Sequence, residues 1–350
     1  MTIMKWSETT IHTSSGEQMG IAPEIISASR STDIPAFHAE WLMHRLEQHY
    51  VKWINPFNQS PQYISFEKAK FVVFWSKNPA PLMKYLRAME KYRFGYYFQF
   101  TLNDYEDEKF ERCVPPLENR IATFKALSEQ IGKDRVLWRF DPLILTPDLG
   151  VDDLLAKIKR VGDRIAPFTR KLVFSFADIA CYKKVGNNLN RKQLECAEFS
   201  KEQMVEAAGR IAALCKSWGI KAATCGESVN LSRFGIEHNK CIDDELILKI
   251  SGNDPALRHL LGADLYDQQE LFASPDKKRT KKIKDPGQRE ACGCVFSKDI
   301  GQYNTCPHMC AYCYANTSEN VVKRNAALVS STSETIIADG DPAVKIREKS

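Results

Sequence analysis

Hydrophobic positions along the chain form short apolar runs that alternate with longer segments of helical periodicity. Six runs have the length and the β-branched or aromatic content of buried strands, at 24–31, 70–75, 93–104, 135–145, 171–179 and 220–227. Helical spacing of apolar residues follows most of these runs, at 34–49, 78–91, about 116–131, 151–165 and 201–219. Strands that are apolar on both faces and alternate with helices predict a parallel sheet covered by helices.

The regular alternation also bears on how the predicted sheet is wound. The chain lacks a glycine-rich dinucleotide-binding fingerprint, which favours a parallel (β/α)6 partial TIM-type barrel of the α/β class over a doubly wound sheet. We predict that the barrel covers residues 1–265. The charged segment 266–290, punctuated by prolines, is predicted as an exposed linker, and residues 291–350 as a cysteine-rich tail.

Composition limits the class of protein further. The 350 residues are 43% hydrophobic and 27% charged, which is typical of a globular chain, and the net charge of +5 permits an anionic partner without requiring one. No apolar run is long enough to span a bilayer, and the N-terminus lacks the apolar centre of a secretory signal. The eleven cysteines are an odd number. We therefore expect a cytoplasmic protein without a membrane partner, whose clustered thiols bind metal or do redox work.

Polar residues at the ends of the predicted strands are the first candidates for chemistry, because barrel enzymes place their active sites there. Arg139 is the most informative, since "WRFDP" puts a charge inside an apolar run, where burial without a partner costs several kcal/mol. A bound carboxylate or phosphate would satisfy Arg139, and so would Asp141 on the same face of the strand. The other candidates at strand ends are Arg30, Ser76, Lys77, Asn78 and Glu227.

Three closely spaced cysteines near the C-terminus form the clearest motif. Cys306, Cys310 and Cys313 stand at spacings of four and three, and Tyr312 precedes the third. Cubane iron–sulfur clusters are held by thiolates in tight runs of this kind, and a cluster with three protein ligands leaves one iron open to a small molecule. The alternative is a zinc site that His308 or another cysteine completes, because zinc normally takes four ligands.

The stretch "CPHMCAYCYAN" (306–316) resembles the signature of radical S-adenosylmethionine (SAM) enzymes. The resemblance implies a [4Fe-4S] cluster on the three cysteines, which makes the C-terminal segment an iron–sulfur tail. It also implies SAM bound at the open iron, a low-potential electron donor, and a 5'-deoxyadenosyl radical that abstracts hydrogen from an unknown substrate. The fold of that superfamily is a six-unit partial barrel, in agreement with the six predicted strands.

The resemblance suggests roles for the candidates at the strand ends. We assign cofactor binding to Arg30, Ser76, Lys77, Asn78 and Tyr312, and catalytic roles to Arg139, Asp141 and Glu227. Arg139 is the expected anchor for an anion such as the SAM carboxylate.

Two features depart from the usual radical SAM pattern. The cysteine loop follows all six predicted strands, whereas the loop normally follows the first, and "WSKNP" stands where the superfamily has Gly-Gly-Glu. The segments "ISASRSTDIPAF" and "CGCVFSKDIGQYNTCPHMCAYCYAN" also resemble the family called domain of unknown function 1848, which brings no known substrate. A tail that leaves the sixth unit can fold back over the same mouth, because the first and sixth strands flank the gap of an open barrel.

Four other cysteines form a second candidate site, namely Cys225, Cys241, Cys292 and Cys294. Three of them lie in predicted loops and Cys225 ends the sixth predicted strand. Four thiolates suit a fully ligated second [4Fe-4S] cluster or a structural zinc, and either would tie the tail to the barrel. The alternative is that they are ordinary free cysteines, which are common buried residues.

Two other functions remain open from the sequence. The first is a barrel protein whose iron–sulfur or zinc site is structural or senses the redox state. The second is a nucleic-acid repair lyase of the spore-photoproduct-lyase type, which the basic run "KKRTKKIK" (277–284) and "WRFDP" suggest. A solvated linker is the favoured interpretation of the basic run.

Overall fold

A large parallel sheet organises the computed structural model, which describes residues 6–263 and 283–338. The sheet has eight strands in the order β11-β10-β9-β8-β7-β6-β3-β12, and every neighbouring pair is parallel. Its six central strands confirm the six predicted from the sequence: β3 (Ile25–Ala28), β6 (Phe71–Ser76), β7 (Gly95–Thr101), β8 (Val136–Leu143), β9 (Lys171–Phe176) and β10 (Lys221–Thr224). Two short strands occupy the edges, β11 (Glu237–His238) and β12 (Lys298–Asp299).

Helices follow the strands at the predicted places, and α7 was not predicted. Those that follow the central strands are α1 (Ile34–Phe37), α2 (Ala39–Glu47), α3 (Ala80–Met83), α4 (Leu86–Met89), α5 (Leu117–Ile131), α6 (Val151–Ile165), α7 (Lys183–Arg191) and α8 (Lys201–Trp218). Further along, the described residues include α9 (Asp244–Ile250), α10 (Pro255–Leu260) and α12 (Glu319–Ala326). The predicted helix 34–49 is interrupted at His38, and the predicted helix 78–91 consists of short turns. None of the helices in the described ranges combines the length and hydrophobicity needed to cross a membrane.

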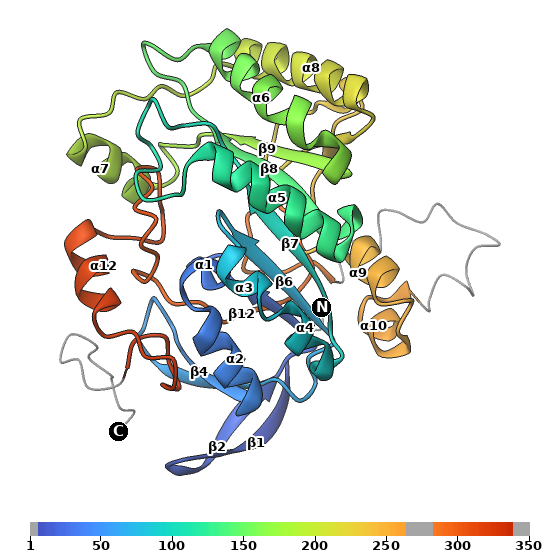
Figure 1. Ribbon diagram of the computed structural model, residues 1–350, viewed down its shortest axis with the longest axis vertical. Coiled ribbons are helices and arrows are strands. Elements are labelled where there is room, and N and C mark those ends of the chain that lie inside the picture. Colours follow the sequence, from blue (N-terminus) through green and yellow to red (C-terminus); the bar gives the residue numbers. More distant parts are fainter. Residues whose placement is uncertain (1–5, 264–282, 339–350) are drawn as a thin grey trace.

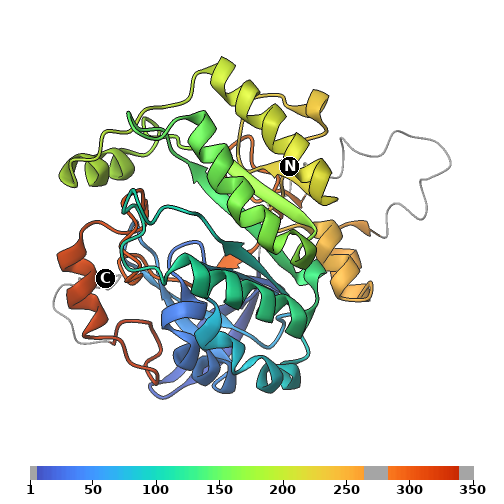
Figure 2. The ribbon, with the colours of Figure 1, turned by 45° about the horizontal axis from the view of Figure 1, so that its top comes forward.

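Both faces of the large sheet are buried, which explains why its strands are continuous apolar runs. On one face, side chains such as Phe74, Phe98 and Trp138 belong to the core that includes α5, α6 and α8. Figures 1 and 2 show these three helices lying together along one side of the strands. On the other face, Val73 and Tyr97 pack in a second cluster with residues of α9, α10 and the segment 283–295.

A second sheet was not predicted. It has four strands in the order β1-β2-β5-β4, with bounds Ser7–Thr13, Gly16–Ala22, Pro61–Ser65 and Tyr50–Ile54 for β1, β2, β5 and β4. Much of β1 and β2 is exposed, so these strands lack the apolar runs that marked the buried ones. The β2–β5 contact requires a glycine, because a Cβ on Gly20 would lie 2.7 Å from the Tyr63 carbonyl oxygen.

The C-terminal tail adds a strand to the large sheet. β12 pairs in parallel with β3, so that Asp299 lies opposite Ser27. The Asp299 carboxylate accepts hydrogen bonds from the Ser27 hydroxyl at 2.9 Å, the Ser29 hydroxyl at 2.9 Å, the Arg30 N–H at 2.7 Å and the Gly301 N–H at 2.9 Å. The tail is thereby fixed to the first central strand. The boundary predicted between barrel, linker and tail falls largely on residues outside the described ranges, and it stays a prediction.

Candidate functional site

The loop that carries Cys306, Cys310 and Cys313 lies against the carboxyl ends of β3 and β6. Asp33, just after β3, makes this junction. Its carboxylate accepts hydrogen bonds from the Ser76 hydroxyl at 2.7 Å and the Lys77 N–H at 2.7 Å, and it contacts His308 Nε2 at 2.8 Å. The predicted cofactor residues Ser76 and Lys77 therefore contribute to holding the loop. Asn78 adds its backbone N–H, which donates to the Ser76 hydroxyl at 3.0 Å.

Tyr312 is fixed by a buried charged network at the ends of β6 and β7. Its hydroxyl accepts from Lys77 Nζ at 2.9 Å and from Asn103 Nδ2 at 3.0 Å, and it donates to Glu111. Although burial opposes the ionised carboxyl, Lys77 and Arg120 lower the pKa of Glu111 to about 2. The loop thus depends on an ionised carboxylate. Glu111 and Arg120 were not predicted, because nothing in their local sequence indicates that they meet Tyr312.

The three thiols of the loop are half-buried and interact electrostatically with one another. Burial raises the pKa of Cys306 to about 12, and it also raises those of Cys310 and Cys313. Lys77 acts in the opposite direction on Cys310, without overcoming the effect of burial. Thiols in such a place ionise readily only when a metal supplies positive charge, and this donor set suits a metal that prefers thiolates.

His308 lies between the first two of these cysteines in sequence, but its ring is occupied elsewhere. Nε2 contacts Asp33 at 2.8 Å, and Nδ1 lies 3.5 Å from the Cys113 carbonyl oxygen. Because both ring nitrogens have partners, this arrangement does not favour a zinc site that His308 completes.

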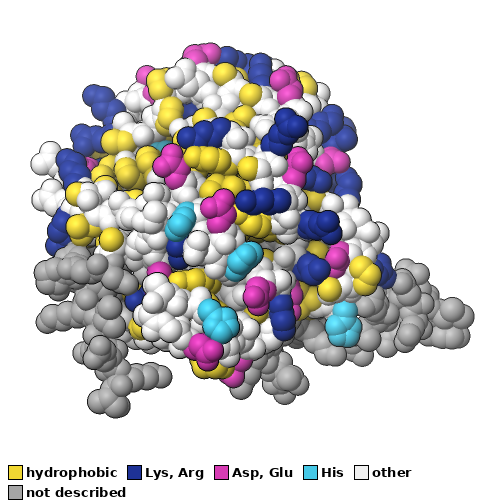
Figure 3. Space-filling model, turned by 60° about the horizontal axis from the view of Figure 1, so that its bottom comes forward, with side chains coloured by type: hydrophobic (Ala, Val, Ile, Leu, Met, Phe, Trp, Pro, Cys, Tyr) yellow, Lys and Arg dark blue, Asp and Glu magenta, His cyan; other side chains and the backbone are white. Residues whose placement is uncertain are grey.

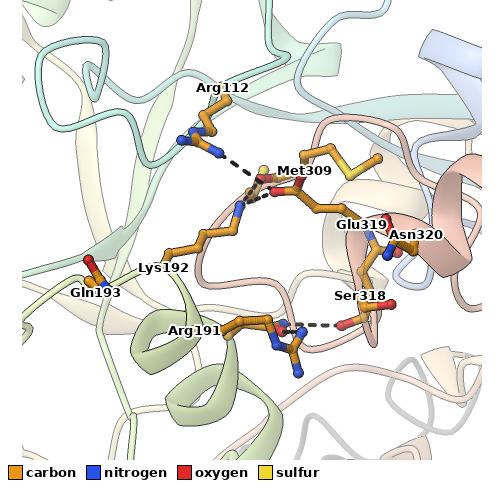
Figure 4. A pocket seen from close by; sticks show the side chains of 11 residues that line it. Arg112, Arg191, Lys192, Gln193, Met309, Ser318, Glu319 and Asn320 are labelled. Atoms are coloured by element: carbon orange, nitrogen blue, oxygen red, sulfur yellow. Dashed lines mark hydrogen bonds and ion pairs between the residues drawn. The ribbon is translucent and has the colours of Figure 1, made fainter.

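A cavity of about 450 Å³ opens beside the cysteine loop, and Cys310 contributes to its lining. Arg112, Arg191 and Lys192 give the cavity a positive lining, with one acidic residue, Glu319. Figure 4 shows Arg112 and Lys192 pointing toward Glu319, at 3.8 Å and 2.8 Å between charged atoms. The positive lining exceeds the charge of Glu319, so the cavity is suited to an anionic ligand.

The other four candidate cysteines meet on the sheet face that the second hydrophobic cluster covers. The sulfur atoms of Cys225 and Cys241 are 3.3 Å apart. Cys294 interacts electrostatically with both Cys241 and Cys292. Two cysteines from the region of β10 and β11 are thus joined to two from the tail.

Arg139 lies beside this group and makes several contacts at once. Its guanidinium pairs with Asp141, at 3.1 Å from Nε, and Nη1 donates to Cys241 Sγ at 3.0 Å. Nη1 also lies 3.2 Å from Gln99 Oε1. Of the two interpretations that the sequence left open, the contacts favour the pair with Asp141. The additional contact with Cys241 was not predicted.

Arg30 and Arg139 both lie near the Trp75 ring. The guanidinium carbons of Arg30 and Arg139 are 5.6 and 5.4 Å from the centre of the Trp75 ring. Arg30 Nη2 is buried and has no hydrogen-bond partner among the described residues. Although burial opposes the charge, neighbouring groups, Cys294 foremost, raise the pKa of Arg30. A further acceptor beside Arg30 is therefore expected.

Glu227 has the environment expected of a group that exchanges protons. Its Oε1 accepts from the Phe176 N–H at 2.9 Å, and burial raises the pKa of the carboxyl to about 6. Such a pKa suits the catalytic role predicted for Glu227. That role stays a prediction.

In the part of the chain that the structure describes, no set of three or more His, Cys, Asp or Glu side chains has the arrangement to hold a metal ion as it stands. The tail nevertheless contributes to both groups, with Cys306, Cys310 and Cys313 in one and Cys292 and Cys294 in the other. Tyr314, next to Cys313, donates from its hydroxyl to the Arg30 carbonyl oxygen at 2.6 Å, and Arg30 borders the other group.

The fold and these side chains define an α/β protein with a large parallel sheet and a cysteine-rich C-terminal segment. The chain belongs to the family described as domain of unknown function (DUF1848), which matches residues 25–315. The resemblance to that family is confirmed. A search of curated proteins gave no match.

Two solved structures show a weak similarity to the chain. One, from Bacteroides thetaiotaomicron VPI-5482, is assigned as an alpha-L-fucosidase, with 12% identity, a TM-score of 0.24, and coverage of 55% of this chain and 84% of that one. The other is a beta-N-acetylhexosaminidase from Bacteroides fragilis NCTC 9343, with 13% identity, a TM-score of 0.30, and coverage of 70% and 71%. Similarity at this level carries no argument about activity.

Proposed function

We propose that the protein is a radical SAM enzyme whose [4Fe-4S] cluster is held by Cys306, Cys310 and Cys313. The observation that carries the proposal is the position of the cysteine loop. In the enzymes that the motif resembles, the loop follows the first strand of the barrel. Here the loop follows β12, which pairs in parallel with β3, and α12 comes after it. A strand–loop–helix unit is thereby present at the start of the sheet, although it is encoded at the end of the chain.

The strand order supports the proposed partial barrel. From β3 to β10, the central strands lie side by side in the order in which they occur along the chain. A doubly wound sheet reverses direction at a switch point, and the units of a barrel follow one another without reversal. We propose on this basis a (β/α)6 partial barrel that β12 extends at one edge.

The residues around the loop suit the proposed cofactor. When bound, a [4Fe-4S] cluster with one open iron supplies a site for the amino and carboxylate groups of SAM and the electron for its cleavage. The chain itself holds the three thiols in a half-buried loop, and Tyr312 anchors that loop to Lys77 and Glu111. We therefore propose that Lys77 and Tyr312 position the loop, as Ser76 does through Asp33.

The positively lined cavity is the proposed site for the anionic part of SAM or of the substrate. Arg112, Arg191 and Lys192 lie around it, and Cys310 borders it. SAM carries a carboxylate, for which guanidinium and ammonium groups are suitable partners. Cytoplasmic location, a low-potential electron donor and a small-molecule substrate of unknown identity belong to the same proposal.

A nucleic-acid substrate has less support. The basic run 277–284 lies outside the described residues except for its last two positions. On the face shown in Figure 3, Lys and Arg side chains are interspersed with Asp, Glu and hydrophobic ones. That face offers no continuous basic surface for phosphates.

Anaerobic reconstitution tests the proposed function. We expect brown protein that forms 5'-deoxyadenosine when dithionite and SAM are added. Cys306→Ala, Cys310→Ala and Cys313→Ala should each abolish that product, and Cys113→Ala, at an exposed cysteine, should not. Colourless protein with stoichiometric zinc, or an active Cys310→Ala variant, would refute the proposal and favour a structural or redox-sensing site.

A further inference from the structure

We infer that Cys225, Cys241, Cys292 and Cys294 bind a second metal centre through four thiolates, independently of the SAM-binding loop. All four belong to or pack against the second hydrophobic cluster, and the sulfur atoms of Cys225 and Cys241 are in contact at 3.3 Å. Cys294 interacts electrostatically with both Cys241 and Cys292. The group joins residues near the end of β10 to the tail, which are distant in sequence. Chance packing of ordinary cysteines does not require four of them to meet.

The donors around these sulfur atoms are those that stabilise thiolates. Cys241 Sγ accepts hydrogen bonds from Arg139 Nη1 at 3.0 Å and from Asn239 Nδ2 at 3.3 Å. Cys294 Sγ receives the Ile242 N–H at 3.5 Å. Hydrogen bonds of this kind orient metal ligands and tune the metal that they bind.

The charges around the four cysteines also support a metal centre there. Two guanidinium groups, of Arg30 and Arg139, border the four thiols, and Arg139 is 97% buried. Asp141 pairs with Arg139, and Asp285 lies 3.7 Å from Arg30, but Arg30 Nη2 still lacks an acceptor within residues 6–263 and 283–338. Four thiolates around one zinc ion, or around an oxidised [4Fe-4S] core, carry a net charge of about −2. Such a centre supplies the acceptor that buried Arg30 Nη2 lacks.

The spacing of the sulfur atoms is compatible with closure around a metal. A disulfide needs about 2.05 Å, and tetrahedral zinc–thiolate bonds of about 2.3 Å separate sulfurs by about 3.8 Å. The observed 3.3 Å between Cys225 and Cys241 lies between these values, and zinc needs a small outward movement. An iron–sulfur cluster needs a larger opening. A zinc ion and an iron–sulfur cluster can each be bound by four thiolates, and metal analysis distinguishes the two.

The second centre would also fasten the tail. Cys292 and Cys294 lie just before β12, and the SAM-binding loop follows β12. Closing the long segment between Cys241 and Cys292 around a metal restricts the unfolded chain. The centre therefore positions the tail that carries Cys306, Cys310 and Cys313.

Metal analysis of a variant without the first site tests this inference. In Cys306→Ala/Cys310→Ala/Cys313→Ala, we expect about four irons with matching sulfide, or about one zinc, per chain. Adding Cys292→Ser and Cys294→Ser should remove that metal. Adding Cys113→Ser and Cys181→Ser, both at exposed cysteines, should leave it in place. The metal and sulfide contents are measured without SAM cleavage. The inference can therefore hold or fail whether or not the protein is a radical SAM enzyme.

Two further measurements keep the test decisive if the tail variant folds poorly. Cys225→Ser changes the end of β10 and leaves the tail sequence intact, and it should also lower the metal content. In the metal-loaded protein, Cys225 and Cys292 should resist alkylation until a strong chelator is added. The inference would be overturned if the variant without Cys306, Cys310 and Cys313 contained no metal and its Cys225 and Cys292 were alkylated at once. A disulfide between Cys225 and Cys241 in that metal-free variant would overturn it as well.

Discussion

Replacing Asp299 by Asn tests how the C-terminal tail is attached. The change keeps the size of the side chain but exchanges one accepting oxygen for an NH₂ group. If the remaining oxygen serves Ser29 and Gly301, the NH₂ group faces the Ser27 hydroxyl and the Arg30 N–H, which donate to Oδ2 at 2.9 and 2.7 Å. Each unsatisfied buried donor costs about 1–3 kcal/mol, and partial relaxation reduces the sum. We therefore expect a loss of about 2–4 kcal/mol in the free energy of unfolding.

Denaturant unfolding of the metal-free protein measures this loss, with Asp148→Asn as the control. Asp148 is exposed, so its substitution should change stability by less than about 0.5 kcal/mol. Limited proteolysis should also cleave the tail of Asp299→Asn faster than that of the control. A variant as stable as the control, with an equally resistant tail, would show that Asp299 does not fasten the tail to β3.

Three further changes test buried charges elsewhere. Glu111→Gln leaves Lys77 and Arg120 buried without their carboxylate, and denaturant unfolding should show a loss of about 3–5 kcal/mol; a loss below 1 kcal/mol would contradict the network. Burial lowers the pKa of Lys298 to about 8, so the unfolded chain binds more protons between about pH 8 and 10.5, and stability rises with pH there. Lys298→Met should accordingly be more stable than the parent by about 2 kcal/mol at pH 7 and should lose this advantage near pH 10.5; an advantage independent of pH would refute the assignment. Burial also lowers the pKa of His38 to about 4, so stability should fall as the pH drops from about 6.5 to 4, and His38→Gln should flatten that part of the stability curve; an unchanged slope would count against it.

The large sheet was predictable because burial on both faces leaves a local signal. β7, for example, is buried at five of its seven positions and reads as one apolar run. β1 carries only one fully buried residue, Ile11, so its sequence does not distinguish it from a loop. The same reasoning applies to the site. The spacing of the thiols marks them as candidate metal ligands, but the contacts of Asp33 and Glu111 are made with partners more than 200 residues away.

Arg30 shows why such roles escape a reading of the sequence. It was predicted to bind a cofactor because it follows the first strand. In the structure the backbone of Arg30 binds the tail. Its N–H donates to Asp299 at 2.7 Å, and its carbonyl oxygen accepts from the Tyr314 hydroxyl at 2.6 Å. Its guanidinium lies against Trp75 and interacts electrostatically with Cys294 of the other group of thiols. One residue at the carboxyl end of β3 thus binds the added strand and the cysteine loop through its backbone, and its side chain interacts with the second group. None of these partners is near Arg30 in sequence, so its local sequence gives no signal for them.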